Sequence, residues 1–275
     1  RLNLRIYQAE DIILSTILPV LDDFGLVVID QFADEVKPVG LKVRTIDTFR
    51  LQGAGGVDPD ELLERSHLLV DALRAVFDHK MPVDPMNRIL VPASVPWEGV
   101  DMLRAYNGYA RQLGLRYTQT RVQEILLGRP GLVQKLWAYF QARFDPDLQG
   151  DRAAAMKAAA DACETEILQI TDHDQDRVFS TLFNLMQATL RTNFFRTDRP
   201  EHYLSFKMLA ANVKVMPEPR LKYEVYVHHR EMEGIHLRGG AIARGGIRWS
   251  DREDYRREIF DLASTQMVKN VLIVP

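Results

Sequence analysis

The spacing of the apolar residues changes twice along this chain, and the two changes divide it into three parts. Near the start, Leu2, Leu4 and Ile6 alternate with polar residues, as in a strand with one buried face. From residue 58 to about residue 198, apolar residues recur at the three- and four-residue spacing of helices. Around residues 199–200 the spacing returns to two. We therefore expect an α+β protein with a mostly helical middle region.

Residues 1–57 have the element order of a small α+β module. A helical pattern over residues 12–21 follows the first strand, and extended runs over residues 24–32 and 41–51 come next. This order begins the βαββαβ arrangement of a ferredoxin-like fold. Ligand-binding ACT domains share the order, and the turn Asp23-Phe-Gly25 resembles theirs. We expect an ACT-like module here, whose later elements would extend to about residue 92.

Several positions make this prediction specific enough to test. Val43, Ile46 and Phe49 are predicted core residues of the third extended run, and residues 88–91 form a candidate short strand.

The second part, residues 58–198, is predicted to be a mostly helical domain with apolar stripes that face its core. The stripes consist of Leu62, Leu69, Leu73 and Val76, then Val122, Ile125 and Leu126, then Val133, Leu136, Trp137 and Phe140, and then Phe179, Leu182, Phe183 and Met186.

The glycine-rich run Gly53-Ala-Gly-Gly56 lies between a predicted strand and a predicted helix, as a dinucleotide-binding loop would. The third glycine of such a loop would fall at position 58, which is Asp58. Asp58 instead suits the N-cap of a helix, with Pro59 in its first turn and Glu61 closing a capping box. The capping interpretation is preferred, and no cofactor-binding residue is assigned in this chain.

Composition argues against two classes of partner and suggests a compartment. The 275 residues carry a formal net charge of −3, so there is no broad basic surface for nucleic acid. No apolar run approaches the ~18–20 residues of a membrane span, and no signal peptide is visible. The single cysteine, Cys163, fits a reducing cytoplasmic compartment and is expected to be a packing residue.

Metal binding is not expected. His228 and His229 are neighbours in a predicted strand, so their side chains point to opposite faces and cannot share one ion. His173 lies between aspartates, but the run lacks the glycine and the distal glutamate of a calcium loop. It is interpreted as an exposed helix start.

The third part, residues 199–275, contains the residues best suited to bind an anion. Glycine pairs at 239–240 and 245–246 lie among arginines, and glycine lets a backbone approach a ligand closely. Guanidinium groups pair with carboxylates through two parallel hydrogen bonds. Residues 251–269 follow as a predicted helix, on which Gln266 and Lys269 are neighbours. Placed behind an Arg-Gly-Gly turn at residues 244–246, these groups could hold a small dianion.

The same region resembles glutamate dehydrogenases. The runs Ala243-Arg-Gly-Gly-Ile-Arg-Trp-Ser-Asp-Arg252 and Gln266-Met-Val-Lys269 are similar to the entry of the catalytic domain, most closely in the large bacterial NAD-specific type. The resemblance implies that residues 199–275 are the first elements of an α/β catalytic domain. Because the chain begins without Met and stops at the apolar run 271–275, we expect it to be an internal segment of a longer subunit.

The resemblance also implies roles for individual residues. Arg244, Gly245 and Gly246 take the place of a Lys-Gly-Gly motif that binds one substrate carboxylate, and the exchange of lysine for Arg244 puts the detailed pose in doubt. Gln266 and Lys269 match the pair that binds the other carboxylate. The family's catalytic lysine, catalytic aspartate and NAD domain would lie beyond residue 275, so no catalytic residue is expected within the chain.

Two functions follow as expectations. The parent protein would interconvert L-glutamate with 2-oxoglutarate and ammonia using NAD, while this segment alone would be inactive. Alternatively, the segment is a regulatory module that senses an amino-acid effector through its ACT-like part. Because ACT-like units often pair their sheets, a homo-oligomer is expected in either case.

Overall fold

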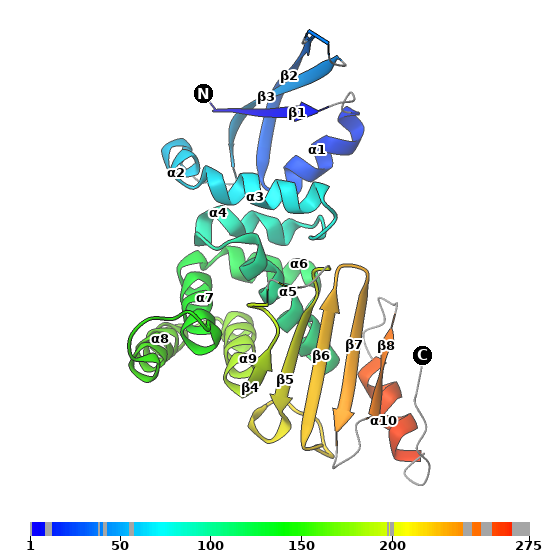
Figure 1. Ribbon diagram of the computed structural model, residues 1–275. Helices are drawn as coiled ribbons and strands as arrows, with labels where there is room; N and C mark the ends of the chain where they lie inside the picture. The colour runs from blue at the N-terminus through cyan, green and yellow to red at the C-terminus, as the bar shows by residue number, and fades with distance from the viewer. Residues whose placement is uncertain are drawn as a thin grey trace. The chain divides into compact units, whose positions relative to one another are not determined.

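The computed structural model describes residues 2–8, 13–37, 39–40, 43–54, 58–196, 198, 201–238, 244–248 and 255–265. It has the expected α+β character, with helices and two antiparallel sheets (Figure 1). The chain divides into two compact units, residues 1–100 and residues 101–275. Each unit is described separately.

The first unit opens with a three-stranded antiparallel sheet and one helix. Strand β1 (Leu2–Gln8), helix α1 (Leu14–Asp23), strand β2 (Leu26–Val36) and strand β3 (Arg44–Ala54) follow one another in the predicted order. The sheet order is β1-β3-β2, so the first and last strands of the module are neighbours. This is the strand–helix–strand–strand start that the sequence predicts, and its three strands are seen at the top of Figure 1.

One face of this sheet builds the core of the module. Leu4 on β1 is opposite Phe49 on β3, and Phe49 is fully buried. The prediction for β3 was correct for Phe49 but wrong for Val43, which precedes the strand and is 42% exposed. Ile46 is only half-buried, because strand side chains alternate and it points to the face opposite Phe49. The buried face carries Thr45 and Asp47 instead.

The remainder of the first unit is helical. The predicted N-cap of helix α2 (Pro59–Glu64) is confirmed, since the Asp58 carboxylate accepts a hydrogen bond from the Asp60 backbone N–H at 2.8 Å. Glu61, the predicted partner in a capping box, forms an ion pair with Arg65 at 2.8 Å. Helix α3 (Ser66–Phe77) buries Leu69, Leu73 and Val76 of the predicted stripe.

The predicted strand at residues 88–91 is wrong. A 3₁₀ helix, η1 (Pro85–Ile89), runs into a short helix, α4 (Leu90–Ala93). Asp84 starts the turn by accepting a hydrogen bond from the Met86 N–H at 2.8 Å, and Pro85 supplies a helix-compatible φ. Because apolar side chains point inward all around this turn, the run resembles a buried strand in sequence.

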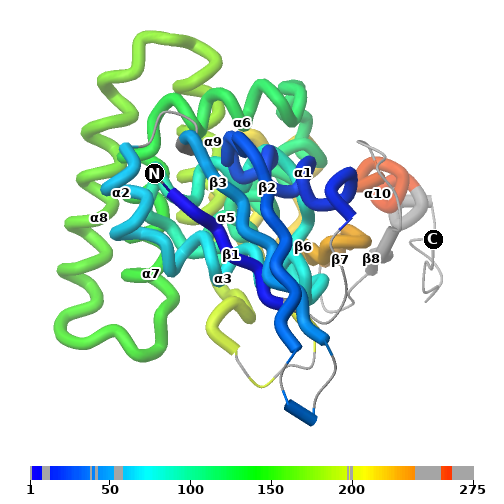
Figure 2. The backbone as a smooth tube through the Cα atoms, turned by 90° about the horizontal axis from the view of Figure 1, so that it is seen from above, coloured from blue at the N-terminus to red at the C-terminus, as the bar shows by residue number. Residues whose placement is uncertain are grey.

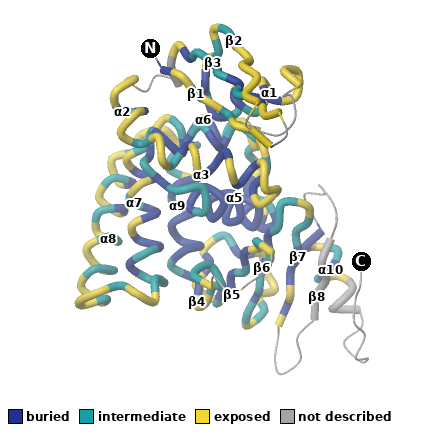
Figure 3. Tube along the Cα trace, turned by 45° about the horizontal axis from the view of Figure 1, so that its top comes forward, coloured by how far each residue is buried: buried dark blue, intermediate teal, exposed yellow. Residues whose placement is uncertain are grey.

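The second unit contains a helical layer and a five-stranded sheet. Helix α5 (Trp97–Gln112) crosses the division at residue 100 and is followed by α6 (Gln119–Leu127), α7 (Pro130–Phe144), α8 (Arg152–Ile167) and α9 (His173–Ala188). The predicted stripes of α6, α7 and α9 are all buried. Helix α8 lies at the outside of the layer beside α7 (Figure 2). It is largely exposed, in contrast to the buried α5 and α9 (Figure 3).

The sheet consists of antiparallel strands in simple sequential order. Its strands are β4 (Thr189–Thr192), β5 (Leu204–Leu209), β6 (Tyr223–His229), β7 (Met232–Arg238) and β8 (Arg244–Arg248), with a 3₁₀ turn η2 (Ala210–Asn212) after β5. The last described helix is α10 (Tyr255–Thr265). Each strand in β4-β5-β6-β7-β8 pairs with the next along the chain.

Helix α5 packs on the sheet through aromatic side chains. Tyr106 stacks on Phe206 of β5 with ring centroids 4.3 Å apart, and Tyr109 lies 5.3 Å from Tyr226 of β6. Phe140 of α7 extends the cluster by an edge contact with Tyr106. Large aromatic side chains contribute much of the burial energy of a core. This cluster therefore fixes the helical layer against one face of the sheet.

Candidate functional site

Strand β8 contains the first three predicted site residues. Arg244, Gly245 and Gly246 pair with Leu237, His236 and Ile235 of β7, respectively. Gln266 and Lys269 lie outside the described residues. The structure thus places the glycine pair in strand β8, whose described neighbouring strand is β7.

Helix α10 lies against β8 and is anchored in the interior by Arg256. The Arg256 side chain pairs with Glu224 of β6 through two hydrogen bonds. Its Nε donates to Glu224 Oε2 at 2.9 Å, and its Nη2 donates to Oε1. The side chains of Arg256 and Glu224 are 6% and 0% exposed, so water cannot replace either partner. Two parallel hydrogen bonds fix orientation as well as distance.

Two residues of α5 complete this network. The Tyr109 hydroxyl donates to Glu224 Oε2 at 2.8 Å, and the Gln112 side-chain oxygen accepts from the Arg256 backbone N–H at 3.0 Å. Burial raises the pKa of Tyr109 well above its ordinary value, and the negative charge of Glu224 raises it further. Tyr109 therefore remains a hydrogen-bond donor at every physiological pH.

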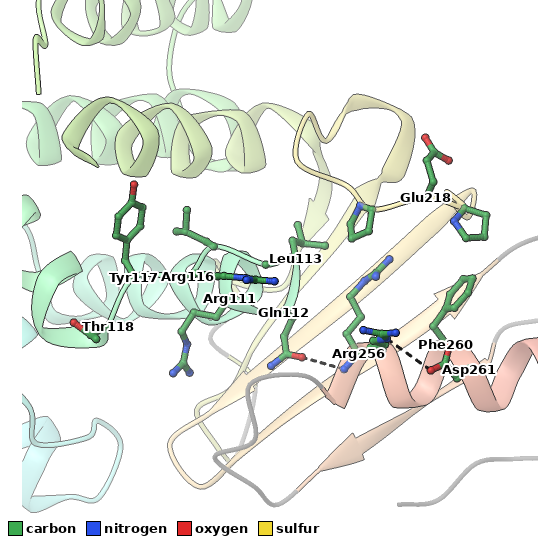
Figure 4. Close-up of a pocket in the computed structure, with 15 residues that line it drawn as sticks. Arg111, Gln112, Leu113, Arg116, Tyr117, Thr118, Glu218, Arg256, Phe260 and Asp261 are labelled. Atoms are coloured by element: carbon green, nitrogen blue, oxygen red, sulfur yellow. Dashed lines mark hydrogen bonds and ion pairs between the residues drawn. The ribbon is translucent and has the colours of Figure 1, made fainter. Parts of the chain in front are cut away.

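A cavity of about 850 Å³ opens beside this network (Figure 4). Its walls are the end of α5 with the loop after it, the turn around Glu218, and the outer side of α10. Of the arginines along it, Arg256 is paired with Glu224, Arg111 lies 3.6 Å from Glu233, and Arg257 lies 4.0 Å from Asp261. The cavity is thus lined by cations that are mostly compensated within the protein.

A second buried cluster joins the start of α5 to β6 around Asp101. The Asp101 carboxylate accepts hydrogen bonds from Arg104 at 2.9 Å and lies 2.8 Å from His202 Nε2 and 3.3 Å from His228 Nε2. Burial alone would raise the pKa of Asp101, but His228, His202 and Arg104 together hold that pKa well below its ordinary value. A carboxylate held ionised in this way ties α5 to the sheet rather than acting as an acid.

The predictions for the adjacent histidines, for the start of α9 and for Cys163 agree with the structure. His228 is buried and His229 is half-buried, as expected for neighbours on opposite strand faces. Asp172 caps α9 by accepting a hydrogen bond from the Gln175 N–H at 2.8 Å. Cys163 is buried, which raises the pKa of its thiol to about 12. Within the described ranges no group of His, Cys, Asp and Glu has the arrangement of a metal site.

Sequence reasoning missed the network around Glu224 and Arg256. The only local signal is that Glu224 shares a strand face with Tyr226 and His228, which period-two alternation places on one side of β6. A charged residue on such a face requires a buried partner. The identity of that partner, 32 positions later in the chain, cannot be read from the pattern.

Comparison with protein-family models gives three matches in order along the chain. Residues 1–62 match the ACT3 domain of glutamate dehydrogenase, and residues 81–146 match its helical motif 3. Residues 162–275 match the catalytic domain of bacterial NAD-glutamate dehydrogenase. The last match includes both β8 and α10.

Similar proteins match nearly the whole chain. The NAD-specific glutamate dehydrogenase of Mycobacterium tuberculosis strain H37Rv is 36% identical over 95% of the chain. Those of Pseudomonas aeruginosa strain PAO1 and Halomonas elongata are 33% and 34% identical over 100% and 99% of it. The chain spans only 17% of the length of each of these relatives.

No helix among the described residues is both long and apolar enough to cross a membrane. The three family matches follow the order of ACT-like module, helical region and catalytic domain, and the relatives share this stretch at one-third identity. Over nearly its whole length, this chain is therefore similar to a segment of the bacterial NAD-specific glutamate dehydrogenases.

Proposed function

We propose that this chain provides the substrate-carboxylate side of the active site of an NAD-dependent glutamate dehydrogenase. The observation that carries the proposal is the match of residues 162–275 to the catalytic domain of bacterial NAD-glutamate dehydrogenase. The whole enzyme interconverts L-glutamate with 2-oxoglutarate and ammonia. We keep the division into an ACT-like module at residues 1–57, a helical domain at 58–198 and a catalytic part at 199–275.

In this proposal the dicarboxylate substrate is held at both ends. The Arg244 guanidinium binds one carboxylate through paired hydrogen bonds, while Gly245 and Gly246 let the β8 backbone approach it. Gln266 and Lys269 bind the other carboxylate. Two described features support the arrangement: β8 has no described strand on its outer side, and α10, which precedes Gln266 in the chain, lies against it.

The chemical steps are assigned to residues outside this chain. NAD, when bound, accepts the hydride from the α-carbon of glutamate. The described residues do not fit a nucleotide loop, because Asp58 replaces its third glycine and caps α2. We therefore place the NAD domain and the proton-transferring groups in the remainder of the enzyme, and the isolated chain is expected to be inactive.

Steady-state kinetics of the full-length enzyme test the proposal. Lys269→Ala should raise the KM for glutamate about 10- to 150-fold, because one charge-assisted hydrogen bond contributes ~1.5–3 kcal/mol. The KM for NAD should be unchanged. Arg177→Ala, which alters an arginine on α9 and leaves the catalytic strands intact, is the control. A wild-type enzyme that fails to reduce NAD with glutamate would exclude the function, and an unchanged glutamate KM in Lys269→Ala would exclude the site.

A regulatory role is the second candidate, and the ACT3 match of residues 1–62 favours it. An amino-acid effector would bind the ACT-like module near the turn after α1. Calorimetric titration of the chain with a panel of amino acids tests this role. Binding that survives Lys269→Ala but is lost in Gly25→Val, at a position with φ of +74°, would support it. Equal binding by both variants would argue against it.

We also propose that the enzyme is a cytoplasmic homo-oligomer. The absence of cysteine other than Cys163 suits a reducing compartment, and ACT-like sheets offer a surface for self-association. Light scattering of the full-length enzyme over a range of concentrations measures the subunit number. A monomer at every concentration would refute the oligomer.

A further inference from the structure

The pair formed by Arg256 and Glu224 is unusual because it costs free energy to bury two charges. Replacing a buried ion pair by apolar side chains of similar size is often neutral or stabilising, whereas removing one partner is destabilising. Stability alone is therefore a weak reason for such a pair. Its effect on geometry is a better reason than its effect on stability. A bidentate guanidinium–carboxylate contact sets both the distance and the angle between the two elements that carry it.

Four hydrogen bonds converge on this point from three elements. Two join Arg256 of α10 to Glu224 of β6, one joins Tyr109 of α5 to Glu224, and one joins Gln112 of α5 to the Arg256 backbone. Figure 4 shows the Gln112 side chain directed at the first turn of α10. The start of α10 is thus held from two sides, by the sheet and by the helical layer.

A small tilt at the start of a helix displaces its far end by a distance that grows with the length of the helix. Arg256 is the second residue of α10, and Thr265 is the last. Nine residues correspond to roughly 14 Å of helix at about 1.5 Å per residue. A tilt of about 4° at Arg256 would therefore move the far end by about 1 Å, and a displacement of about 1 Å in a positioned group can reduce a rate ~100-fold.

We infer that Glu224 and Arg256 are positioning residues for the substrate-carboxylate site, acting through α10 on the side chains that follow it. This inference rests on the proposed function. The Arg256 guanidinium is paired with Glu224, so its proposed effect on the substrate is indirect. It fixes the direction of α10 relative to β6, and Gln266 and Lys269 follow α10 in the sequence. In this inference, the distance between the two proposed carboxylate-binding groups depends on that direction.

The test removes the paired hydrogen bonds between Arg256 and Glu224 without leaving either charge buried alone. The variant Glu224→Met, Arg256→Met and Tyr109→Phe replaces the three polar side chains by apolar ones of similar size. Its matched control, Lys135→Met with Glu166→Met, removes an ion pair that joins α7 to α8. A second variant, Arg256→Lys, keeps the charge but loses the two-pronged contact, so it serves if the apolar variant does not fold.

Two measurements are made on these variants. In the full-length enzyme, the triple variant and Arg256→Lys should raise the KM for glutamate about tenfold or more, while the KM for NAD and the melting temperature of the triple variant stay near wild type. In the chain itself, amide hydrogen exchange of α10 should accelerate at least about tenfold, while exchange of α8 does not change. The control should alter neither the KM for glutamate nor the exchange of α10.

The outcomes separate the inference from the function it rests on. If α10 exchanges at the wild-type rate in both variants, or if the glutamate KM is unchanged, the positioning role is refuted while glutamate oxidation by the wild type stands. If wild-type enzyme does not oxidise glutamate but α10 loosens in the variants, the proposed function fails and the anchoring of α10 remains. A purely structural role predicts that the triple variant regains both wild-type stability and wild-type KM.

Discussion

Asp101 and His228 are 127 positions apart in the chain, yet the Asp101 carboxylate lies 3.3 Å from His228 Nε2 inside the second unit. His202 and Arg104 reach the same carboxylate. One buried anion thus joins α5, the loop before β5 and β6. Because Asp101 is only 2% exposed, its charge is stabilised by these partners, and the stability of the unit depends on that charge.

Asp101→Asn is therefore expected to lower the free energy of unfolding at neutral pH by about 3–5 kcal/mol, because removing the charge of one partner from a buried ion pair is strongly destabilising. Urea denaturation at pH 7 measures the change. Asp161→Asn on the surface of α8 is the matched control. It removes an exposed pair with Lys157 and should cost less than about 1 kcal/mol. Equal effects of the two substitutions would contradict this account.

The same carboxylate predicts a dependence of stability on pH. The pKa of Asp101 is held well below the 3.8 of an unperturbed aspartate, so the unfolded state binds its proton more readily than the folded state. Its contribution is present above that unfolded value and is lost as the pH falls through the lower pKa of the folded state. Wild type should lose stability more steeply than Asp101→Asn in denaturation series below pH 4. Parallel acid curves would show that other carboxylates dominate.

Helical regions were the easier part to predict. The stripes on α6, α7 and α9 are buried as expected, since an amphipathic helix shows its core face in its sequence at a fixed period. The predicted strand at residues 88–91 does not exist, and the predicted strands that do exist differ from the prediction in detail. The face of β3 that contains Phe49 also buries Asp47, which accepts a hydrogen bond from Gln31 of β2 at 2.5 Å. Burial of a carboxylate depends on that partner, and hydrophobic alternation does not reveal it.

For the candidate site, the sequence shows only those features that are formed by residues close together in the chain. A glycine pair and nearby arginines are visible in the sequence, but the predicted Arg-Gly-Gly turn is wrong, because Gly245 and Gly246 lie in strand β8. The contact between Glu224 and Arg256 joins two elements across the sheet and could not be predicted, because no spacing rule links positions that distant. Whether Arg244, Gln266 and Lys269 bind substrate stays a prediction.

Tyr109→Phe tests the neutral member of the buried network. The hydroxyl donates to Glu224 Oε2 at 2.8 Å in the buried interior, so its removal should cost about 1.5–3 kcal/mol, as for hydrogen bonds to charged groups. Chemical denaturation measures the loss. Tyr117→Phe removes a hydroxyl that donates to Asp174 at 3.0 Å near the surface and is expected to have a smaller effect. The reverse order of the two losses would be inconsistent with a buried network.

Cys163 should be unreactive in the folded protein. Its thiol is buried on α8 and its pKa is raised to about 12, while the reactive species is the thiolate. A thiol reagent should modify the native chain slowly at pH 8 and the urea-unfolded chain rapidly. Fast modification of the native chain would show that α8 opens readily at this position.

Gly108 provides the sharpest test of how closely α5 approaches the sheet. A Cβ at this position would lie 2.3 Å from the Tyr226 hydroxyl and 2.8 Å from Glu233 Oε1. Alanine is the better helix former by about 1 kcal/mol, but overpacking a filled interior costs about 1–3 kcal/mol or more. Gly108→Ala should therefore destabilise the chain, as measured by thermal and urea unfolding.

The control and the rescue make this last prediction specific. Gly131 on α7 has open space where a Cβ would be, so Gly131→Ala should be neutral or stabilise by up to about 1 kcal/mol. Tyr226→Phe removes the nearest atom to the new methyl group, and it should restore part of the stability lost in Gly108→Ala. If the double variant is no more stable than Gly108→Ala alone, the loss arises elsewhere than at the contact between α5 and β6, since a shared contact requires the two substitutions to be non-additive.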